Sequence, residues 1–397
     1  MLSDSKLPGS ADFTAPDDRK SARIAAERLQ MPADGRRVGS FSLARDILRS
    51  SKVKQAGVGA DEVDTGNPDH APVFYLDGEP HRKKRGAIAR FFTPTAVATR
   101  YRPLMERKAE ALIRGVQMDG KASLDKVAHQ MTVAVAAEIV GLTNSNQTSM
   151  AARISATLSA PRIRWKPLAR LLQPIAVGFR ALKFYYLDVR PAIRARRAGR
   201  RDDIISHLLD EDYADRAILI ECMTYAAAGM VTTREFIVMA AWHLFERDAL
   251  RTRFLAGTDE EQFAILEEIL RLEPVASMLS RRSAEEMPGS DSGSTPAGTL
   301  FNIDIRAANV DSSAVGPCPH ALDPDRSKSS GGASLSFGHG PHRCPGSQVA
   351  LQETRIFIDR LLRLPGIRLQ REPRINWHPL LMSYELRDAI VSCDRHV

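Results

Sequence analysis

The chain has 397 residues, of which 43% are hydrophobic and 26% are charged, and its formal net charge is +8. This length and composition are those of a globular protein with a sizeable core, and no apolar run reaches the roughly 18 to 20 residues that a transmembrane helix needs. The polar start of the sequence lacks the apolar stretch of a signal peptide, and four scattered cysteines are too few for a disulfide scaffold. We therefore expect a cytoplasmic protein without a transmembrane anchor.

Basic residues concentrate in two segments, 81–85 and 190–201. Such charge suits an acidic partner, a nucleic acid or an anionic surface. Neither segment contains the interleaved aromatic residues that stack on single-stranded bases, and no zinc-finger or helix-turn-helix spacing surrounds them. We therefore expect no nucleic-acid partner.

The first two-thirds of the chain show helical periodicity, with apolar residues three and four positions apart. Residues 1–20 are polar, and we expect them to form a flexible segment. Residues 97–141 predict two amphipathic helices that are separated at Asp119-Gly120. Residues 215–247 predict one helix of about 50 Å, which is long enough to cross a domain, and its middle is apolar on every face, as in a buried helix.

After residue 280 the apolar segments are short and are separated by Gly, Pro and Ser, so residues 299–303 predict a strand. Residues 309–343 form a long irregular stretch, and a loop of that length in a compact protein is usually functional. No linker or internal repeat is visible. We expect a single domain over residues 1–397, mainly α with a small β portion.

The irregular stretch ends in Phe337-Gly-His-Gly-Pro-His-Arg-Cys344-Pro-Gly346, and a helical pattern follows. A cysteine just before a helix N-terminus is placed where free amides and the helix dipole stabilise a thiolate. The residues alone leave four alternatives open. Cys344 is a haem-iron ligand, a nucleophile assisted by His342, a buried structural cysteine, or part of a zinc cluster. The zinc cluster would consist of Cys318, His320, His339, His342 and Cys344.

These ten residues resemble the haem-binding signature of the cytochromes P450, Phe-Gly-x-Gly-x-His-x-Cys-x-Gly, and fill every fixed position, including Gly346. The resemblance implies that Cys344 is the proximal thiolate ligand, that Phe337 packs near the sulfur, and that His342 lies near a haem propionate. It also implies the P450 fold, with a long distal helix over the haem. A thiolate ligand releases electron density through the iron, which favours O–O bond cleavage.

Other motifs of the same family occur in the expected order upstream. Glu268 and Arg271 match Glu-x-x-Arg, and Arg326 matches the arginine that completes a buried charge triad with this pair. His81 and Arg85 match the family's His-x-x-x-Arg, whose side chains donate to the haem propionates. The resemblance places Arg282 at a third propionate-binding position, with neighbouring Arg281 as a substitute, and residues 307–311 resemble the family's Ala-Asn-Arg-Asp segment.

The long helix then corresponds to the family's distal helix, with its pattern Ala-Gly-x-(Asp or Glu)-Thr. This chain has Ala228, Gly229 and Thr232 at the matching positions, where the small pair leaves room for dioxygen and the hydroxyl points the same way. The departure is Val231, which replaces the acid that helps to relay protons. The protons then come from the substrate, from bound water or from Glu235.

The resemblance implies a monooxygenase that binds haem b and oxidises a mostly apolar small organic substrate with O2, in secondary or catabolic metabolism. Its electrons come from NAD(P)H through a ferredoxin and a ferredoxin reductase, and it acts as a monomer. We expect an acidic ferredoxin to dock on a basic proximal face formed by Arg82, Lys83, Lys84 and Arg343. By family analogy, residues 60–76, 155–187 and 275–279 border the substrate pocket.

Two alternatives to this function stay open. Val231 is compatible with an atypical reaction, namely a peroxide-driven oxygenation, an oxidative coupling or a desaturation. A catalytically silent scaffold that binds a partner enzyme is the other alternative, and the intact cysteine loop argues against it. Residues 161–187 mix basic and large apolar side chains, which fits a substrate-entry lid or contact with a membrane surface.

Overall fold

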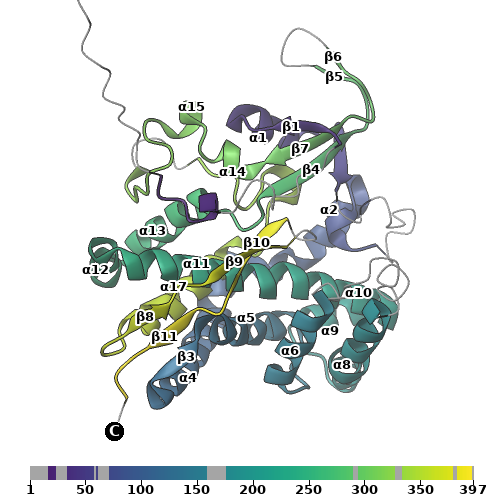
Figure 1. Cartoon of the computed structure of the whole chain (residues 1–397). Coiled ribbons are helices and arrows are strands. Elements are labelled where there is room, and N and C mark those ends of the chain that lie inside the picture. Colours follow the sequence, from purple (N-terminus) through teal and green to yellow (C-terminus); the bar gives the residue numbers. More distant parts are fainter. Residues whose placement is uncertain are drawn as a thin grey trace, which may run out of the picture.

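The computed structural model describes residues 17–23, 34–57, 60, 71–158, 176–288, 294–326, 333–378 and 382–395. Helices account for most of these residues (Figure 1), which confirms the mainly-α class. The α-helices are α1 (Phe41–Arg49), α2 (Gly78–Ala89), α3 (Pro94–Ala96), α4 (Arg102–Asp119), α5 (Leu124–Val140), α6 (Gln147–Leu158), α8 (Arg190–Ala198), α9 (Ile204–Asp210), α10 (Asp215–Tyr225), α11 (Thr232–Glu246), α12 (Asp248–Ala256), α13 (Asp259–Leu272), α14 (Ile305–Ala308), α15 (Ser312–Val315) and α17 (Ser347–Leu362). A further helix covers residues 176–184.

Short 3-10 and π-helical segments join or extend these helices. The 3-10 segments are η1 (Ser21–Arg23), η4 (Val73–Tyr75), η5 (Arg90–Phe92) and η9 (Gly340–His342), and the π-helical segments are η6 (Val97–Tyr101), η7 (Tyr185–Val189) and η8 (Ala226–Val231).

The predicted long helix is present as α10, η8 and α11, which follow one another without a break and cross the molecule in Figure 1. Its second half is buried on nearly every side, as the apolar sequence predicts. The π-helical segment in its middle frees backbone groups, and the Thr132 hydroxyl of α5 donates to the Met230 carbonyl oxygen at 2.8 Å. Single π-helical turns inside α-helices often lie at functional sites.

The two helices predicted within residues 97–141 are also confirmed, as α4 and α5. Gly120 ends α4 in the left-handed region, with φ of +69°, where glycine carries no steric cost. α4 packs against α17, and α5 packs against α11 of the long helix.

The strands form small sheets at the edges of the helical layer (Figure 1). The largest has the order β1-β7-β4-β2, in which β1 is parallel to β7 and the other pairs are antiparallel. The strand predicted at 299–303 is β7. The bounds are β1 (Arg36–Val38), β2 (Val53–Ala56), β3 (Lys121–Ser123), β4 (Met278–Ser283), β5 (Met287–Pro288), β6 (Ser294–Thr295), β7 (Leu300–Asp304), β8 (Arg368–Arg371), β9 (Arg374–His378), β10 (Ser383–Arg387) and β11 (Ile390–Ser392).

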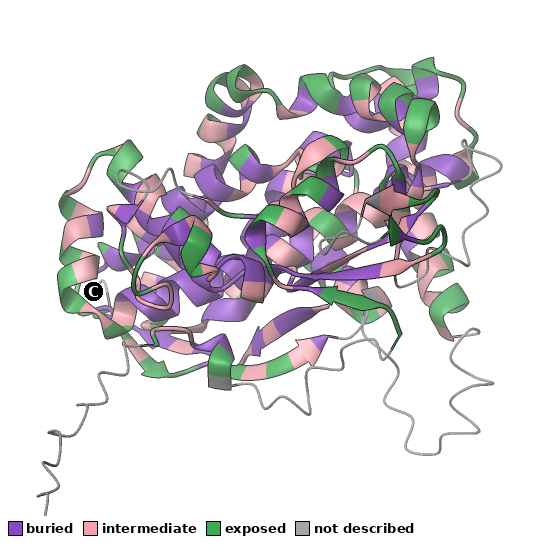
Figure 2. Ribbon diagram, turned by 90° about the horizontal axis from the view of Figure 1, so that it is seen from above, coloured by how far each residue is buried: buried purple, intermediate pink, exposed green. Residues whose placement is uncertain are grey.

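Two groups of buried side chains stabilise the described parts of the fold. The larger one surrounds α11, α5, α4 and α17, and Figure 2 shows it as the buried centre of the molecule. The smaller one lies between α1 and the four-stranded sheet, and includes Ile47 and Ile303. The long helix is therefore packed against other elements on several sides.

Part of the expected flexible N-terminal segment is ordered. Residues 1–16 lie outside the described residues, but 17–23 are anchored against the ends of α11 and α13. The buried carboxylate of Glu273 accepts hydrogen bonds from the backbone amides of Lys20 and Ser21, and the Lys20 ammonium lies 4.4 Å from the centre of the Trp242 ring. The expectation of flexibility over 1–20 is therefore wrong for residues 17–20, because buried acceptors hold their backbone.

Candidate active site

The cysteine loop, defined here as residues 335–346, is a series of tight turns stabilised by backbone hydrogen bonds. The Cys344 amide donates to the Phe337 carbonyl oxygen at 2.8 Å, and the Gly338 amide donates to that of Leu335 at 2.8 Å. Gly340 has φ of +69°, and a Cβ atom there would lie 2.3 Å from the Leu48 carbonyl oxygen. Only glycine lets the loop lie this close to the end of α1.

Cys344 is half-buried at the end of this loop, three residues before α17 begins. Burial raises the pKa of its thiol, whereas the Gly346 amide and the positive charges of Arg85 and Arg343 lower it. Gly346 also leaves room beside the sulfur, since a Cβ atom there would lie 4.0 Å from Cys344 Sγ. The surroundings of the sulfur thus supply the donors that a thiolate needs.

Asn309 fastens the cysteine loop to α13. Its Oδ1 accepts from the Leu335 amide at 2.8 Å, and its Nδ2 donates to Ser336 Oγ at 2.8 Å and to the Arg271 carbonyl oxygen at 3.0 Å. Asn309 is fully buried, so every one of these bonds replaces a bond to water. Asn309 lies in the segment 307–311 that resembles the family's Ala-Asn-Arg-Asp motif, and the motif by itself does not indicate this role.

The expected charge triad is assembled beside the loop. Arg271 donates to both Glu268 oxygens, at 2.7 and 2.8 Å, and Arg326 Nε donates to Glu268 Oε1 at 3.1 Å. All three side chains are buried, and the remaining guanidinium donors are taken up by backbone carbonyl oxygens. This network links α13 to Arg326 and lies beside the cysteine loop.

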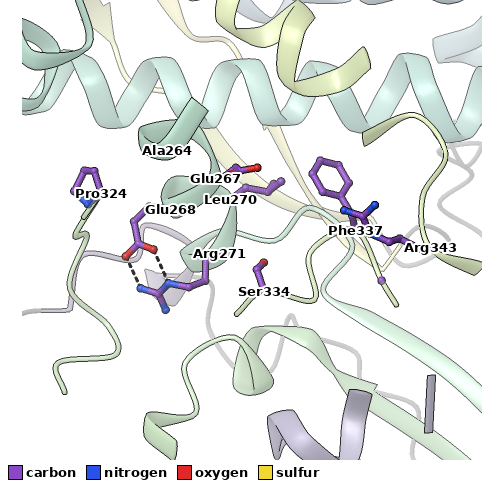
Figure 3. A pocket seen from close by; sticks show the side chains of 10 residues that line it. Ala264, Glu267, Glu268, Leu270, Arg271, Pro324, Ser334, Phe337 and Arg343 are labelled. Carbon is purple, nitrogen blue, oxygen red and sulfur yellow. Dashed lines mark hydrogen bonds and ion pairs between the residues drawn. The ribbon is translucent and has the colours of Figure 1, made fainter. Parts of the chain in front are cut away.

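A pocket lies between this triad and the cysteine loop. Figure 3 shows Glu268 and Arg271 paired on one side of it, and Phe337 and Arg343 on the other. Phe337 packs against the larger core group. Glu267 of α13 also lines this pocket.

A cluster of basic side chains, which we call the cationic cluster, joins α2 to the cysteine loop. The His81 and His342 rings stack with centroids 4.0 Å apart, and His342 Nε2 lies 3.1 Å from Asp77 Oδ1. Arg85 donates to the Arg343 carbonyl oxygen. Burial is the main cause that lowers the pKa of His81 to about 4, and the nearby His342 and Arg85 lower it further.

Arg281, and not Arg282, completes this cluster. Arg281 is 4% exposed, and its charge acts on both His81 and Asp77. Arg282 donates instead to the Gly298 carbonyl oxygen at 3.2 Å, on the exposed side of β4. The expectation for Arg282 is wrong because successive side chains of a strand point to opposite faces. Alternation means that only one of the two arginines can face α2, and the burial of Arg281 shows which one does.

On the distal side, the middle of the long helix has one open face. Ala228 is exposed and Thr232 half-buried, whereas the flanking Met230, Val231 and Thr233 are buried. Thr232 Oγ1 donates to the Ala228 carbonyl oxygen at 2.5 Å, which places the two residues on the same face.

Gly229 lies beside Ala228, and a Cβ atom there would meet only Ala136 Cβ, at 3.9 Å, within the described residues. Ala228 and, in part, Gly229 and Thr232 are thus accessible on this face, where the small pair is expected to leave room for dioxygen.

Glu235 is unavailable as a substitute for the acid missing at position 231. Its carboxylate is fully buried and accepts hydrogen bonds from Arg234, Arg387 and the Leu386 amide. With both oxygens engaged on the side of β10, it is a structural ion-pair member rather than a proton relay.

Lys84 does not belong to a solvent-exposed basic face. It is buried, and its Nζ donates to Glu221 Oε1 at 3.0 Å and to the Ala71 carbonyl oxygen at 2.8 Å. Arg82, Lys83 and Arg343 are exposed, as expected. The expectation for Lys84 is wrong because the side of α2 that faces α10 is inside the molecule.

The zinc alternative finds no support in the described part of the chain, where no three His, Cys, Asp or Glu side chains are grouped as metal ligands. Cys318 is exposed, while Cys222 and Cys393 are buried away from the loop. Of the segment 161–187, residues 161–175 lie outside the described residues. Phe179, Leu182 and Tyr186 beyond them are exposed on one helical face.

Comparisons with known proteins agree with this arrangement. The family model described as Cytochrome P450 matches residues 263–373, which contain the charge triad and the cysteine loop. The Erythromycin C-12 hydroxylase of Saccharopolyspora erythraea is 26% identical over 91% of this chain and 90% of its own length. The chain is a bacterial-type cytochrome P450.

Two further comparisons also extend over most of both chains. The Vitamin D(3) 25-hydroxylase of Pseudonocardia autotrophica is 28% identical over 73% of this chain and 69% of its own. Among solved structures, P450BioI in complex with a fatty-acid-ligated acyl carrier protein has a TM-score of 0.76, at 24% identity over 91% of this chain and 92% of that one. At that identity the structural match establishes the P450 fold alone.

The P450 family implies a haem cofactor, and the residues present fit one. Among the described residues, Arg281 has no carboxylate within ion-pair distance, and its hydrogen bond is to the Ser280 carbonyl oxygen. The cationic cluster contains one carboxylate, Asp77, which is already bonded to His342. A buried guanidinium without an anion is costly, so the cluster suits a ligand that carries carboxylates of its own.

The P450 assignment also makes the protein a monooxygenase, and its fold implies redox partners. Within the described residues, no helix combines the length and the apolar character that crossing a membrane requires.

Proposed function

We propose that the protein inserts one oxygen atom from O2 into a mostly apolar small organic molecule, in secondary or catabolic metabolism, with Cys344 as the thiolate ligand of haem b. One observation carries this proposal. Arg85 of α2 donates to the Arg343 carbonyl oxygen beside Cys344, and Lys84 of α2 donates to Glu221 of the distal helix. The cysteine loop and the distal helix are therefore both bonded to the helix that carries part of the cationic cluster.

Each group of residues has a separate task at this site. Cys344 would bind the iron, and His81, Arg85, Arg281 and His342 would hold the haem carboxylates. A haem bound through a thiolate supplies the electron release that favours O–O bond cleavage. On the opposite side, Ala228, Gly229 and Thr232 leave room for dioxygen, and the Thr232 hydroxyl holds a proton donor in place.

The charge triad acts on the loop rather than on the ligand. Glu268, Arg271 and Arg326 are buried, and the Ser336 hydroxyl of the loop donates to the Leu270 carbonyl oxygen at 2.7 Å in the same helix. A buried triad stabilises little by itself, so its use is to fix the position of the loop and of Cys344.

The substrate class follows from the apolar surroundings and from the relatives. The distal helix offers no charged side chain between Tyr225 and Arg234. Two P450 relatives are named for the hydroxylation of erythromycin and of vitamin D(3). We infer that this chain also hydroxylates a molecule with a large apolar part.

Electrons come from NAD(P)H through a ferredoxin reductase and an acidic ferredoxin. The exposed cations Arg82, Lys83 and Arg343 lie where α2 meets the cysteine loop, and the Arg85 bond to the Arg343 carbonyl oxygen holds these two segments together. Opposite charges steer such an encounter, and docking at this place would bring the ferredoxin close to Cys344.

The decisive experiment compares Cys344→Ala with Cys318→Ala. The reduced carbon monoxide complex of the wild type should show the red-shifted absorption band of a thiolate-bound haem. Cys344→Ala should lose this band, and Cys318→Ala should keep it because Cys318 is exposed and outside the loop. A band that survives Cys344→Ala would show that another residue ligates the iron.

Val231 favours a second candidate, an oxygenation driven by hydrogen peroxide, because the usual acid is absent and the side chain is buried. Peroxide brings its own protons and electrons, so that reaction needs no relay. Product formed with peroxide alone, at a rate above that with O2 and the redox partners, would favour this candidate.

A further inference from the structure

The carboxylates of the distal helix differ in whether their oxygens are free. Asp215 accepts from Arg197 and Tyr185, and Glu246 accepts from Lys20 and Trp242. Glu235 is fully engaged, as described above. Each of these three acids uses both oxygens, so none can exchange a proton without breaking a structural contact.

Glu221 is the exception among the acids of α10, η8 and α11. It is 3% exposed, its Oε1 accepts from Lys84, and its buried Oε2 has no hydrogen-bond partner among the described residues. A buried oxygen without a donor is costly for an ionised carboxylate. Burial accordingly raises the pKa of Glu221, although the Lys84 ammonium lowers it.

Tyr225 lies between Glu221 and the open face of the helix. It follows Glu221 by one helical turn and precedes Ala228 by three residues, and no other titratable side chain occurs before Arg234. Its hydroxyl interacts with Glu221 on one side and with Arg85 on the other. Glu221, Tyr225, Ala228 and Thr232 follow one another at intervals of three and four residues, so they lie along one side of the helix.

Lys84 connects this pair to the other side of the molecule. Its ammonium holds Glu221 and the Ala71 carbonyl oxygen, and it lies 5.3 Å from the centre of the Tyr213 ring. Lys84 is 8% exposed, so a small part of its side chain reaches the surface. Lys84, Glu221 and Tyr225 therefore form a series from α2 to the middle of the distal helix.

We propose that Glu221, acting through Tyr225, supplies the protons that an acid at position 231 would otherwise deliver to this site. This inference rests on the proposed O2-dependent function. Glu221 would transfer its carboxyl proton to the Tyr225 oxygen, while the Tyr225 hydroxyl proton passes to water beside Ala228 and Thr232. The Glu221 carboxylate would regain a proton from the Lys84 ammonium, and Lys84 from solvent. Only O–H and N–H bonds change.

Water has to complete this route, because Tyr225 and Thr232 are seven residues apart, or roughly 10 Å along a helix axis. The open face at Ala228 and Thr232 provides the room for it. Ordered water can replace a direct hydrogen bond at modest cost. Thr232 then positions the last water, and Glu221 is the proton reservoir.

The test compares Glu221→Gln and Tyr225→Phe with Glu246→Gln, an acid-to-amide change on the same helix but at its far end. With a plant-type ferredoxin and its reductase, we would measure O2-dependent NAD(P)H consumption in H2O and in D2O. Both test variants should be slower by at least about tenfold and show a larger solvent isotope effect, and Glu246→Gln should match the wild type in both respects.

Adding Val231→Asp to Glu221→Gln is the rescue experiment, because it restores an acid near Thr232. The double variant should recover most of the lost rate. A rate for Glu221→Gln within twofold of the wild type, or a double variant as slow as the single one, would overturn the proposal and leave Glu221 as a structural partner of Lys84.

Infrared spectroscopy of the resting protein gives a readout that does not depend on turnover. A protonated buried carboxyl group has a C=O stretching band, and Glu353 also contributes one, so the spectra are recorded in a Glu353→Gln background. There the band should be present with native Glu221 and with Glu246→Gln, and absent with Glu221→Gln. A band that persists in Glu221→Gln counts against Glu221 as the proton reservoir. The reduced carbon monoxide band is measured on every variant, since its loss would indicate failure of the haem-thiolate assignment instead.

Discussion

His342 of the cysteine loop stacks on His81 of α2, with ring centroids 4.0 Å apart and ring planes inclined by 32°. The contact joins two segments that are separated by 260 residues of sequence, and Asp77 fixes it by accepting a hydrogen bond from His342. Arg281 comes to the same place from β4. Four basic side chains thus meet around a single carboxylate, an arrangement that an additional anionic ligand would stabilise.

Arg281 and Arg282 form a matched pair for testing which arginine holds the cofactor. Arg281→Met should increase the rate of haem transfer to an excess of apomyoglobin at least several-fold, because a buried charge-assisted contact is lost. Arg282→Met should stay within about twofold of the wild type, since its guanidinium lies on the exposed face of the strand. Equal effects of the two changes would contradict the assignment.

Glu268 and its neighbour Glu267 provide a test of the charge triad. Glu268→Gln leaves Arg271 and Arg326 buried without their anion, so the free energy of unfolding should fall by about 3 kcal/mol. Glu267→Gln should change it by less than about 0.5 kcal/mol, because that side chain is exposed. Denaturant titration of both variants measures the difference. A loss below about 1 kcal/mol for Glu268→Gln would mean that the triad is not needed to hold the fold.

Glu353 in α17 predicts a pH dependence of stability. Burial raises its pKa from 4.5 to about 8, and its Oε1 has no partner among the described residues. Between these two values the folded state binds more protons at this site than the unfolded state, so this group makes stability fall as pH rises from about 4.5 to 8.

Glu353→Gln keeps the shape of the side chain and cannot ionise, so it should remove that part of the slope. Unfolding of the wild type and the variant at several pH values between 5 and 8 measures it, and the gain in stability of the variant over the wild type should grow with pH. A difference that stays constant across this range would show that Glu353 titrates near its ordinary value.

The exposed cations beside the cysteine loop predict a salt-sensitive electron transfer. Charge reversal at Arg82 and Lys83 should slow reduction by an acidic ferredoxin several-fold, and raising the salt concentration should slow the wild type as well, since screening acts over about 8 Å at physiological ionic strength. Stopped-flow reduction under carbon monoxide measures both effects.

Lys84→Glu is the contrasting change for this experiment. It places a second carboxylate against buried Glu221, so it should lower the melting temperature rather than the salt-corrected rate. A reduction rate that changes neither with salt concentration nor with charge reversal at Arg82 and Lys83 would exclude this face as the docking site.

The local pattern of the sequence was sufficient for the elements and for the order of the motifs. The long helix, the two helices on either side of Gly120 and the strand at β7 follow from the spacing of apolar residues, which depends only on neighbours along the chain. The cysteine loop could also be recognised in this way, because its glycines, histidine and cysteine lie within ten consecutive residues. Helical class and P450 membership were therefore available before any tertiary contact.

Which charged side chains are buried, and which partners they meet, was decided only by the tertiary structure. The sequence does not distinguish Arg281 from Arg282 or Lys84 from Lys83, since adjacent residues have the same chemistry and their burial depends on the element packed against them. Glu221 and Glu235 are likewise two acids of one helix, and the distinction between a free and a fully bonded carboxylate arises from α2 on one side and β10 on the other. Burial and long-range pairing set the energies of these groups, and neither is encoded in local spacing.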